Sequence, residues 1–140
     1  MMAEENKDLA KEENILVFCS HSDDQIIGPG GTLAKYAKDG KKVYSYIFSY
    51  GELTHPHFKR KVIVKIRVEE SKKADTDING AGVAFFGLPE GKFLEEARKH
   101  RLKKKIKSII ASFWLLKFLS ALIFVLKVLE TSTISCGFFL

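Results

Sequence analysis

Ile15-Leu16-Val17-Phe18-Cys19-Ser20-His21-Ser22-Asp23-Asp24-Gln25 is the segment that decides the fold of this sequence. An apolar run ends here in one imidazole and two adjacent carboxylates, which predicts a buried strand over residues 14–20. Parallel sheets collect their binding groups where strands end. A His and an Asp three positions apart can face one metal ion while the carboxylate between them faces elsewhere. The segment therefore predicts a zinc ion and a separate base at one edge of a sheet.

The residues that follow predict a strand, helix and strand in succession. Gly30-Gly31-Thr32 opens a helical pattern that closes at Asp39-Gly40, where glycine suits a left-handed helix terminus. Residues 43–48 alternate and concentrate β-formers, so they predict a second strand. We expect the two strands to be parallel and joined by a right-handed crossover.

The alternation of strands and helices continues to about residue 110. The sequence predicts a binding loop over residues 50–61, a helix over 62–78, a short strand over 83–86, a turn over 88–91 and a helix over 95–107. This order predicts an α/β fold class, a Rossmann-like parallel sheet flanked by helices. The sheet is incomplete, and an apolar C-terminal helix or tail follows it.

Composition divides the chain into three parts. Hydrophobic residues make up 46% and charged residues 29% of the sequence, which excludes a disordered or fibrous protein. We expect a flexible N-terminus over residues 1–13, one α/β domain over 14–112 and an apolar tail over 113–140. The N-terminus is acidic and lacks the apolar core of a secretory signal. The two cysteines form no spacing pattern for a disulfide framework, so a cytoplasmic location is expected.

The positive charge is concentrated in one segment. Residues 92–107 hold eight Lys or Arg and two Glu, which equals the whole net charge of +6. A solvated helix face is the favoured interpretation over a phosphate-binding or membrane-surface role. No aromatic residues alternate with these cations, so we expect no nucleic-acid partner.

The apolar tail allows three interpretations. Residues 113–129 are almost all apolar, but the uninterrupted stretch 118–126 is far shorter than the roughly 20 residues that a bilayer requires. The tail is a membrane contact, a plain amphipathic or core helix, or an ending foreign to the fold. The sequence does not indicate an oligomeric state.

Five motifs together resemble one enzyme family. The first is the segment quoted above, and the second is Gly30-Gly31-Thr32. The other three are Tyr50-Gly51-Glu52, Ile66-Arg67 with Glu70 and Ala74, and Phe86-Gly87-Leu88-Pro89-Glu90-Gly91. Their order over residues 14–110 resembles the LmbE-like or PIG-L family of zinc-dependent N-deacetylases. The family removes acetyl groups from sugars of the N-acetylglucosamine type, so an N-acetylated sugar or glycoconjugate is the implied substrate.

The resemblance implies a role for each matching residue. His21 and Asp24 would be zinc ligands, and Asp23 the general base. Arg67 and Glu90 would bind substrate. For His55 and His57, in the adjacent loop, we expect either a substrate-facing position or a merely exposed turn.

The sequence departs from the family pattern in two ways. Ser22 and Gln25 stand where the usual signature has Pro and Glu, which we expect to loosen the loop. The third family ligand is a histidine after a fourth strand, and no histidine follows His100. A catalytic zinc site normally has three protein ligands, so we expect weak metal binding and weak or absent activity unless His55 or His57 substitutes. The composition changes near Ala111, where the fourth strand should begin, which indicates a truncated or frame-shifted reading frame.

Other interpretations remain open from the residues alone. Asp23-Asp24 before a helix is often a solvated cap, and Gly28-Pro29-Gly30-Gly31 lacks the third glycine of a dinucleotide site. Two functions remain: a zinc-dependent N-deacetylase, and a non-catalytic remnant or membrane-associated protein that uses the basic helix and the apolar tail.

Overall fold

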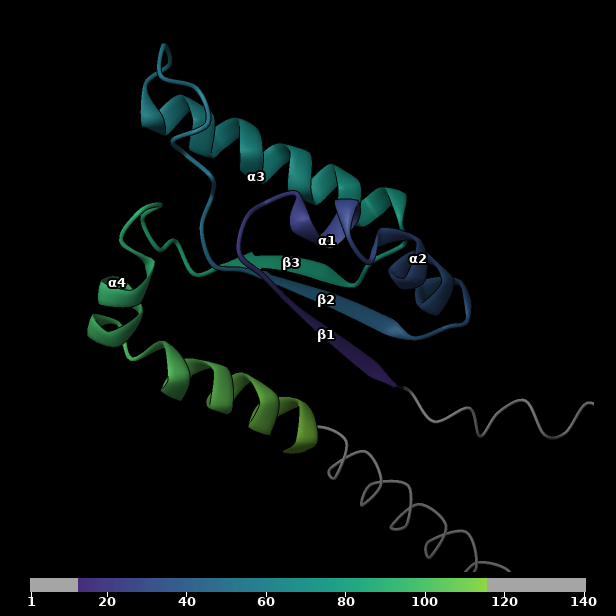
Figure 1. The fold of residues 1–140 in the computed structure, drawn as a ribbon. Helices are drawn as coiled ribbons and strands as arrows, with labels where there is room; N and C mark the ends of the chain where they lie inside the picture. The colour runs from purple at the N-terminus through teal and green to yellow at the C-terminus, as the bar shows by residue number, and fades with distance from the viewer. Residues whose placement is uncertain (1–12, 116–140) are drawn as a thin grey trace, which may run out of the picture. The chain divides into compact units, whose positions relative to one another are not determined.

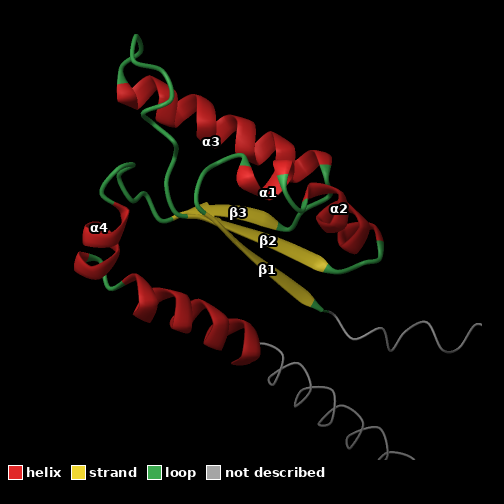
Figure 2. Ribbon diagram, in the orientation of Figure 1, coloured by secondary structure: helices red, strands yellow, loops and turns green. Residues whose placement is uncertain are grey.

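The computed structural model of the chain describes residues 13–115. The strands are β1 (Asn14–Cys19), β2 (Lys42–Ile47) and β3 (Gly82–Phe85), and the helices are α1 (Asp24–Ile27), α2 (Gly30–Lys38), α3 (Arg60–Asp77) and α4 (Phe93–Lys99). Residues 102–115 are also helical. Figure 2 shows these elements. The expectations for residues 1–12 and for most of the apolar tail lie outside the described residues.

The three strands form one parallel sheet in the order β1-β2-β3. Cys19 pairs with Ile47, and Ile47 pairs with Phe85, so the three strands end at a common level. Helices α1, α2 and α3 lie over one face of this sheet (Figure 1). The predicted α/β class with an incomplete parallel sheet is confirmed.

The central strand β2 supplies the core. Its residues Val43, Ser45 and Ile47 are almost fully buried, and alternation with period two places them on one face of the sheet. Leu33 of α2 and Ile63 of α3 are also buried. The predicted buried character of β1 was wrong for most of that strand, since only Cys19 is buried. β1 is an edge strand of the described sheet, and edge strands bury less surface.

Aromatic side chains gather along the three strands. The ring of Phe18 stacks on those of Tyr46 and Phe48, and Phe48 also contacts Phe86 and Phe93. Aromatic pairs of this kind add stabilisation beyond the area that they bury.

Two helix ends follow the sequence signals. Gly40 has a φ of 83°, so the residue after α2 takes the expected left-handed conformation. After α3 the left-handed residue is Asn79, with a φ of 55°. A Cβ at the next residue, Gly80, would collide with the Asp75 carboxylate, so a larger residue there would require that side chain to move.

Two predicted segments differ in the structure. The loop after β1 contains the one-turn helix α1, which the sequence did not signal. The expected helix over 95–107 is interrupted, because α4 ends at Lys99 and Arg101 has a φ of 50°. No glycine or proline marks this break, and a left-handed arginine costs roughly 1–2 kcal/mol. The chain divides into two compact units, Met1–Glu96 and Ala97–Leu140.

No helix within residues 13–115 is both long enough and apolar enough to cross a bilayer.

Replacement of Ile47 by alanine tests the importance of the central strand. Ile47 is fully buried, so Ile47→Ala should lower the free energy of unfolding by about 2–5 kcal/mol. Ile27→Ala is the matched control, because Ile27 is 79% exposed and its loss should cost less than about 0.5 kcal/mol. Urea denaturation followed by circular dichroism measures both. Equal losses in the two variants would contradict the assignment of the core to β2.

Candidate functional site

Three loops meet at the carboxyl edge of the sheet. They follow β1, β2 and β3, and the parallel pairing brings them to the same side. Backbone hydrogen bonds extend this pairing beyond the strands, because the N–H of Ser49 donates to the Ser20 carbonyl and that of Leu88 to the Phe48 carbonyl. The loops are therefore fixed to one another from their first residues.

His21 and Asp24 lie side by side after β1. The backbone N–H of His21 donates a 2.9 Å hydrogen bond to Asp24 Oδ2, and His21 Nδ1 is 3.9 Å from the same oxygen. Both side chains are 46% exposed. The backbone bond orients the carboxylate, while both side chains remain partly accessible to solvent.

A buried set of hydrogen bonds holds this loop in place. The carbonyl of Ser22 accepts bonds from Gln25 Nε2 at 3.1 Å and from the Ser71 hydroxyl at 2.9 Å. The hydroxyl of Ser22 donates to the Tyr50 carbonyl at 3.2 Å. Ser22, Gln25 and Ser71 are all buried. The two departures from the family signature, which we expected to loosen the loop, thus supply hydrogen bonds that proline and an ionised glutamate cannot donate.

Glu52 and Glu90 connect the second loop to the third. Glu52 Oε1 accepts a 3.0 Å bond from the N–H of Glu90, and Glu90 Oε2 accepts a 2.8 Å bond from the N–H of Leu53. Glu90 Oε1 lies 3.9 Å from His21 Nε2, so this carboxylate also reaches the first loop. These two hydrogen bonds between carboxylates and backbone amides hold the second and third loops together.

Asp23 faces the helix α3 rather than its neighbour Asp24. Asp23 Oδ2 is 3.8 Å from an Arg67 guanidinium nitrogen, which also lies 3.5 Å from Glu70 Oε2. The Arg67 side chain is 22% exposed, whereas that of Asp23 is 44% exposed. The two carboxylates of the Asp23-Asp24 pair therefore have different partners.

His55 and His57 are exposed in the loop after β2. The ring of His55 contacts that of Phe58 edge to face. Within residues 13–115 no group of three His, Cys, Asp or Glu side chains is arranged to hold a metal ion. Neither histidine therefore completes a three-ligand set with His21 and Asp24.

Sequence reasoning missed the residues that support the site. Ser71 and Ser49 are buried serines for which the sequence predicted no role, and Ser49 donates to Glu52 at 3.3 Å. Glu52 belongs to a motif that the resemblance included, but no role was expected for it. A buried serine gives no sequence signal, because its partner is a backbone carbonyl far along the chain.

The fold and the site define the class: a parallel α/β protein with polar loops clustered at the carboxyl edge of its sheet. Residues 16–120 match the family described as PIG-L: GlcNAc-PI de-N-acetylase. The match covers most of the chain, and the protein belongs to this family. The recognition made from the sequence motifs is confirmed.

Solved structures show the same fold. N,N'-diacetylchitobiose deacetylase from Pyrococcus horikoshii is 20% identical with a TM-score of 0.55, and the alignment covers 58% of this chain and 31% of that one. GalB, the 4-carboxy-2-hydroxymuconate hydratase from Pseudomonas putida KT2440, is 23% identical with a TM-score of 0.53, over 58% of this chain and 36% of that one. This chain thus spans about a third of the length of these proteins. A search of curated proteins found no match.

Cys19 ends β1 directly before the site. Burial, together with the nearby Asp24 carboxylate, raises the pKa of its thiol from 9.0 to about 11. The folded protein therefore keeps this thiol protonated at pH 8, and the unfolded chain has about 100-fold more thiolate, because each pKa unit is a factor of ten.

Thiol modification tests this environment. In a Cys136→Ser variant, in which Cys19 is the remaining thiol, Ellman's reagent at pH 8 should react about 100-fold more slowly with the folded protein than with the chain in guanidinium chloride. Equal rates would mean that Cys19 is not buried at the end of β1.

Proposed function

We propose that the three loops at the carboxyl edge form part of the active site of a deacetylase-type hydrolase. In this proposal His21 and Asp24 hold a divalent metal ion such as zinc, and Asp23 is the general base. The substrate is an N-acetylated sugar or glycoconjugate. Family membership supports the class of reaction, and the pairing of His21 with Asp24 is the observation that carries the assignment of residues.

The donor atoms of His21 and Asp24 suit two neighbouring positions around zinc. With bond lengths near 2.0–2.1 Å and tetrahedral angles, two ligand atoms lie about 3.4 Å apart. His21 Nδ1 and Asp24 Oδ2 are 3.9 Å apart, so a small side-chain rotation brings them to that separation. Because the described residues offer this pair and no group of three, we propose that a metal held by them alone binds weakly.

The bound metal would lower the pKa of a water molecule and polarise the amide carbonyl. Asp23 would accept the proton from that water and pass it to the departing amine. The Arg67 guanidinium, 3.8 Å away, is the charged partner that orients the Asp23 carboxylate. In this proposal Asp23 acts as the base and not as a third ligand.

Substrate contacts are assigned to the rim of the same edge. Arg67 and Glu90 bring a cation and a carboxylate next to Asp23 and His21 respectively, a combination that can bind sugar hydroxyls or a phosphate. His55 and His57 are exposed on the adjoining loop and are proposed to contact the more distant part of a glycoconjugate.

The fold does not by itself choose the reaction. The structural neighbours include a hydratase as well as a deacetylase, and one fold commonly supports several reactions. The hydrolase assignment therefore rests on family membership.

Metal titration tests the ligand assignment. Isothermal titration of the metal-free protein with zinc chloride should show one weak site, and His21→Ala or Asp24→Asn should weaken it more than about tenfold. Asp39→Asn is the matched control, since Asp39 is an exposed acid beyond the end of α2. Unchanged affinity in Asp24→Asn would place the metal elsewhere.

Acetate release from N-acetylglucosamine tests the role of Asp23. Asp23→Asn should lower kcat about 10²–10⁴-fold while zinc affinity stays within a factor of about three, because a base but no ligand is lost. Parallel loss of zinc binding in this variant would instead make Asp23 a ligand, contrary to the proposal.

A further inference from the structure

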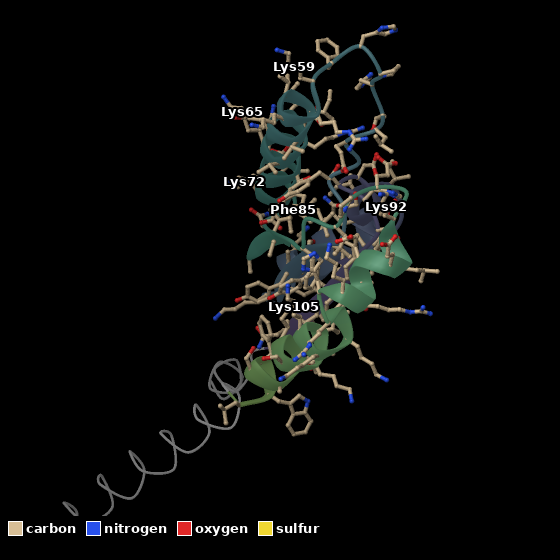
Figure 3. The ribbon with its side chains drawn as sticks, turned by 90° about the vertical axis from the view of Figure 1, so that its left-hand side faces the viewer. Lys59, Lys65, Lys72, Phe85, Lys92 and Lys105 are labelled. Atoms are coloured by element: carbon tan, nitrogen blue, oxygen red, sulfur yellow. The ribbon has the colours of Figure 1, made fainter. Side chains whose placement is uncertain are left out.

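Residues 97–115 carry charge of one sign. They contain seven Lys or Arg residues and no Asp or Glu. Lys103, Lys104, Lys105 and Lys107 are exposed, and none of them forms an ion pair within the described residues. Figure 3 shows Lys105 on the helical stretch 102–115. This segment takes no part in the site proposed above.

The helix over residues 102–115 has two different sides. Leu102, Ile106, Ile109 and Phe113 recur at helical spacing, and each is buried or half-buried. A neighbouring side has the same spacing but is exposed, and it consists of Lys103, Lys107, Ile110 and Trp114. We name these four residues the basic-apolar stripe.

The basic-apolar stripe combines cations with large apolar side chains in solvent. Ile110 is 42% exposed and Trp114 is 74% exposed, and the adjacent Leu115 is 61% exposed. Exposed apolar groups of this size favour a partner that removes them from water. Tryptophan in particular prefers a boundary where its ring is in an apolar medium and its N–H remains hydrated.

We propose that the basic-apolar stripe binds the surface of an anionic lipid membrane. Phosphate and carboxylate headgroups would neutralise Lys103 and Lys107, while Ile110 and Trp114 enter the boundary between headgroups and acyl chains. A second copy of this chain is disfavoured as the partner, because it would bring the same positive charges together. RNA is disfavoured because it would leave the apolar end of the stripe in water.

The intrinsic fluorescence of the full chain measures this binding directly, because Trp114 is the one tryptophan in the sequence. Phosphatidylcholine vesicles that contain about one third phosphatidylserine should shift its emission to the blue and protect it from acrylamide quenching. Raising NaCl from about 0.1 M to about 0.5 M should weaken the binding, since salt screens the headgroup charges. Vesicles of phosphatidylcholine alone should give little shift.

Paired alanine variants locate the surface. Lys103→Ala with Lys107→Ala should weaken binding to the anionic vesicles roughly 30-fold, at about a factor of five for each lysine. Lys72→Ala with Lys73→Ala is the charge-matched control, because both lysines are exposed on α3 (Figure 3 labels Lys72), and it should change binding less than about threefold. Unchanged circular dichroism confirms that both variants are folded.

Three outcomes would overturn the proposal. They are equal blue shifts with neutral and anionic vesicles, equal weakening by the two alanine pairs, and a blue shift of the same size with an RNA oligonucleotide in place of vesicles. Zinc affinity and acetate release are measured separately, so failure here leaves the proposed hydrolase site unaffected.

Discussion

Parallel pairing of three strands is the constraint on which the site depends. The central strand β2 bonds to a neighbour on each side and buries Val43 and Ile47 beneath the helices. Because all three strands run in one direction and end at one level, the loops after them meet at a single edge. Residues far apart in the sequence, such as His21 and Glu90, approach to 3.9 Å for this reason. An antiparallel arrangement of the same strands would carry the loop after β2 to the opposite edge of the sheet.

Buried polar side chains hold the loops at this edge, and exposed charged side chains lie around them. The buried hydroxyls of Ser22 and Ser71 form hydrogen bonds, which avoids the free-energy cost of a buried polar group without a partner. The groups suited to chemistry, His21, Asp23 and Asp24, are about half exposed and are positioned through their backbone or through Arg67. Most of the residues that hold the loops thus differ from the exposed charged residues, although Glu90 both holds a loop and lies beside His21.

The predictions from sequence succeeded where a local signal was present. Apolar runs identified the strands, and Asp39-Gly40 marked the end of α2, because strands and helix termini depend on neighbouring residues. They failed at α1, which has one turn and is too short to show a helical period, and at Arg101, where no glycine or proline marks the break. The family motifs pointed to His21 and Asp24 from the sequence, but they could not show that Ser71 on α3 holds the same loop.

The sequence by itself determined the family, the α/β class and the residue types available for chemistry. Those properties follow from short sequence patterns, which are present whether or not the chain is folded. Only the tertiary structure decided the partners: Asp23 beside Arg67, Asp24 beside His21, and Glu52 and Glu90 bound to each other's loops. Such contacts join residues from different elements, and their geometry exists only after the sheet has set the loops side by side.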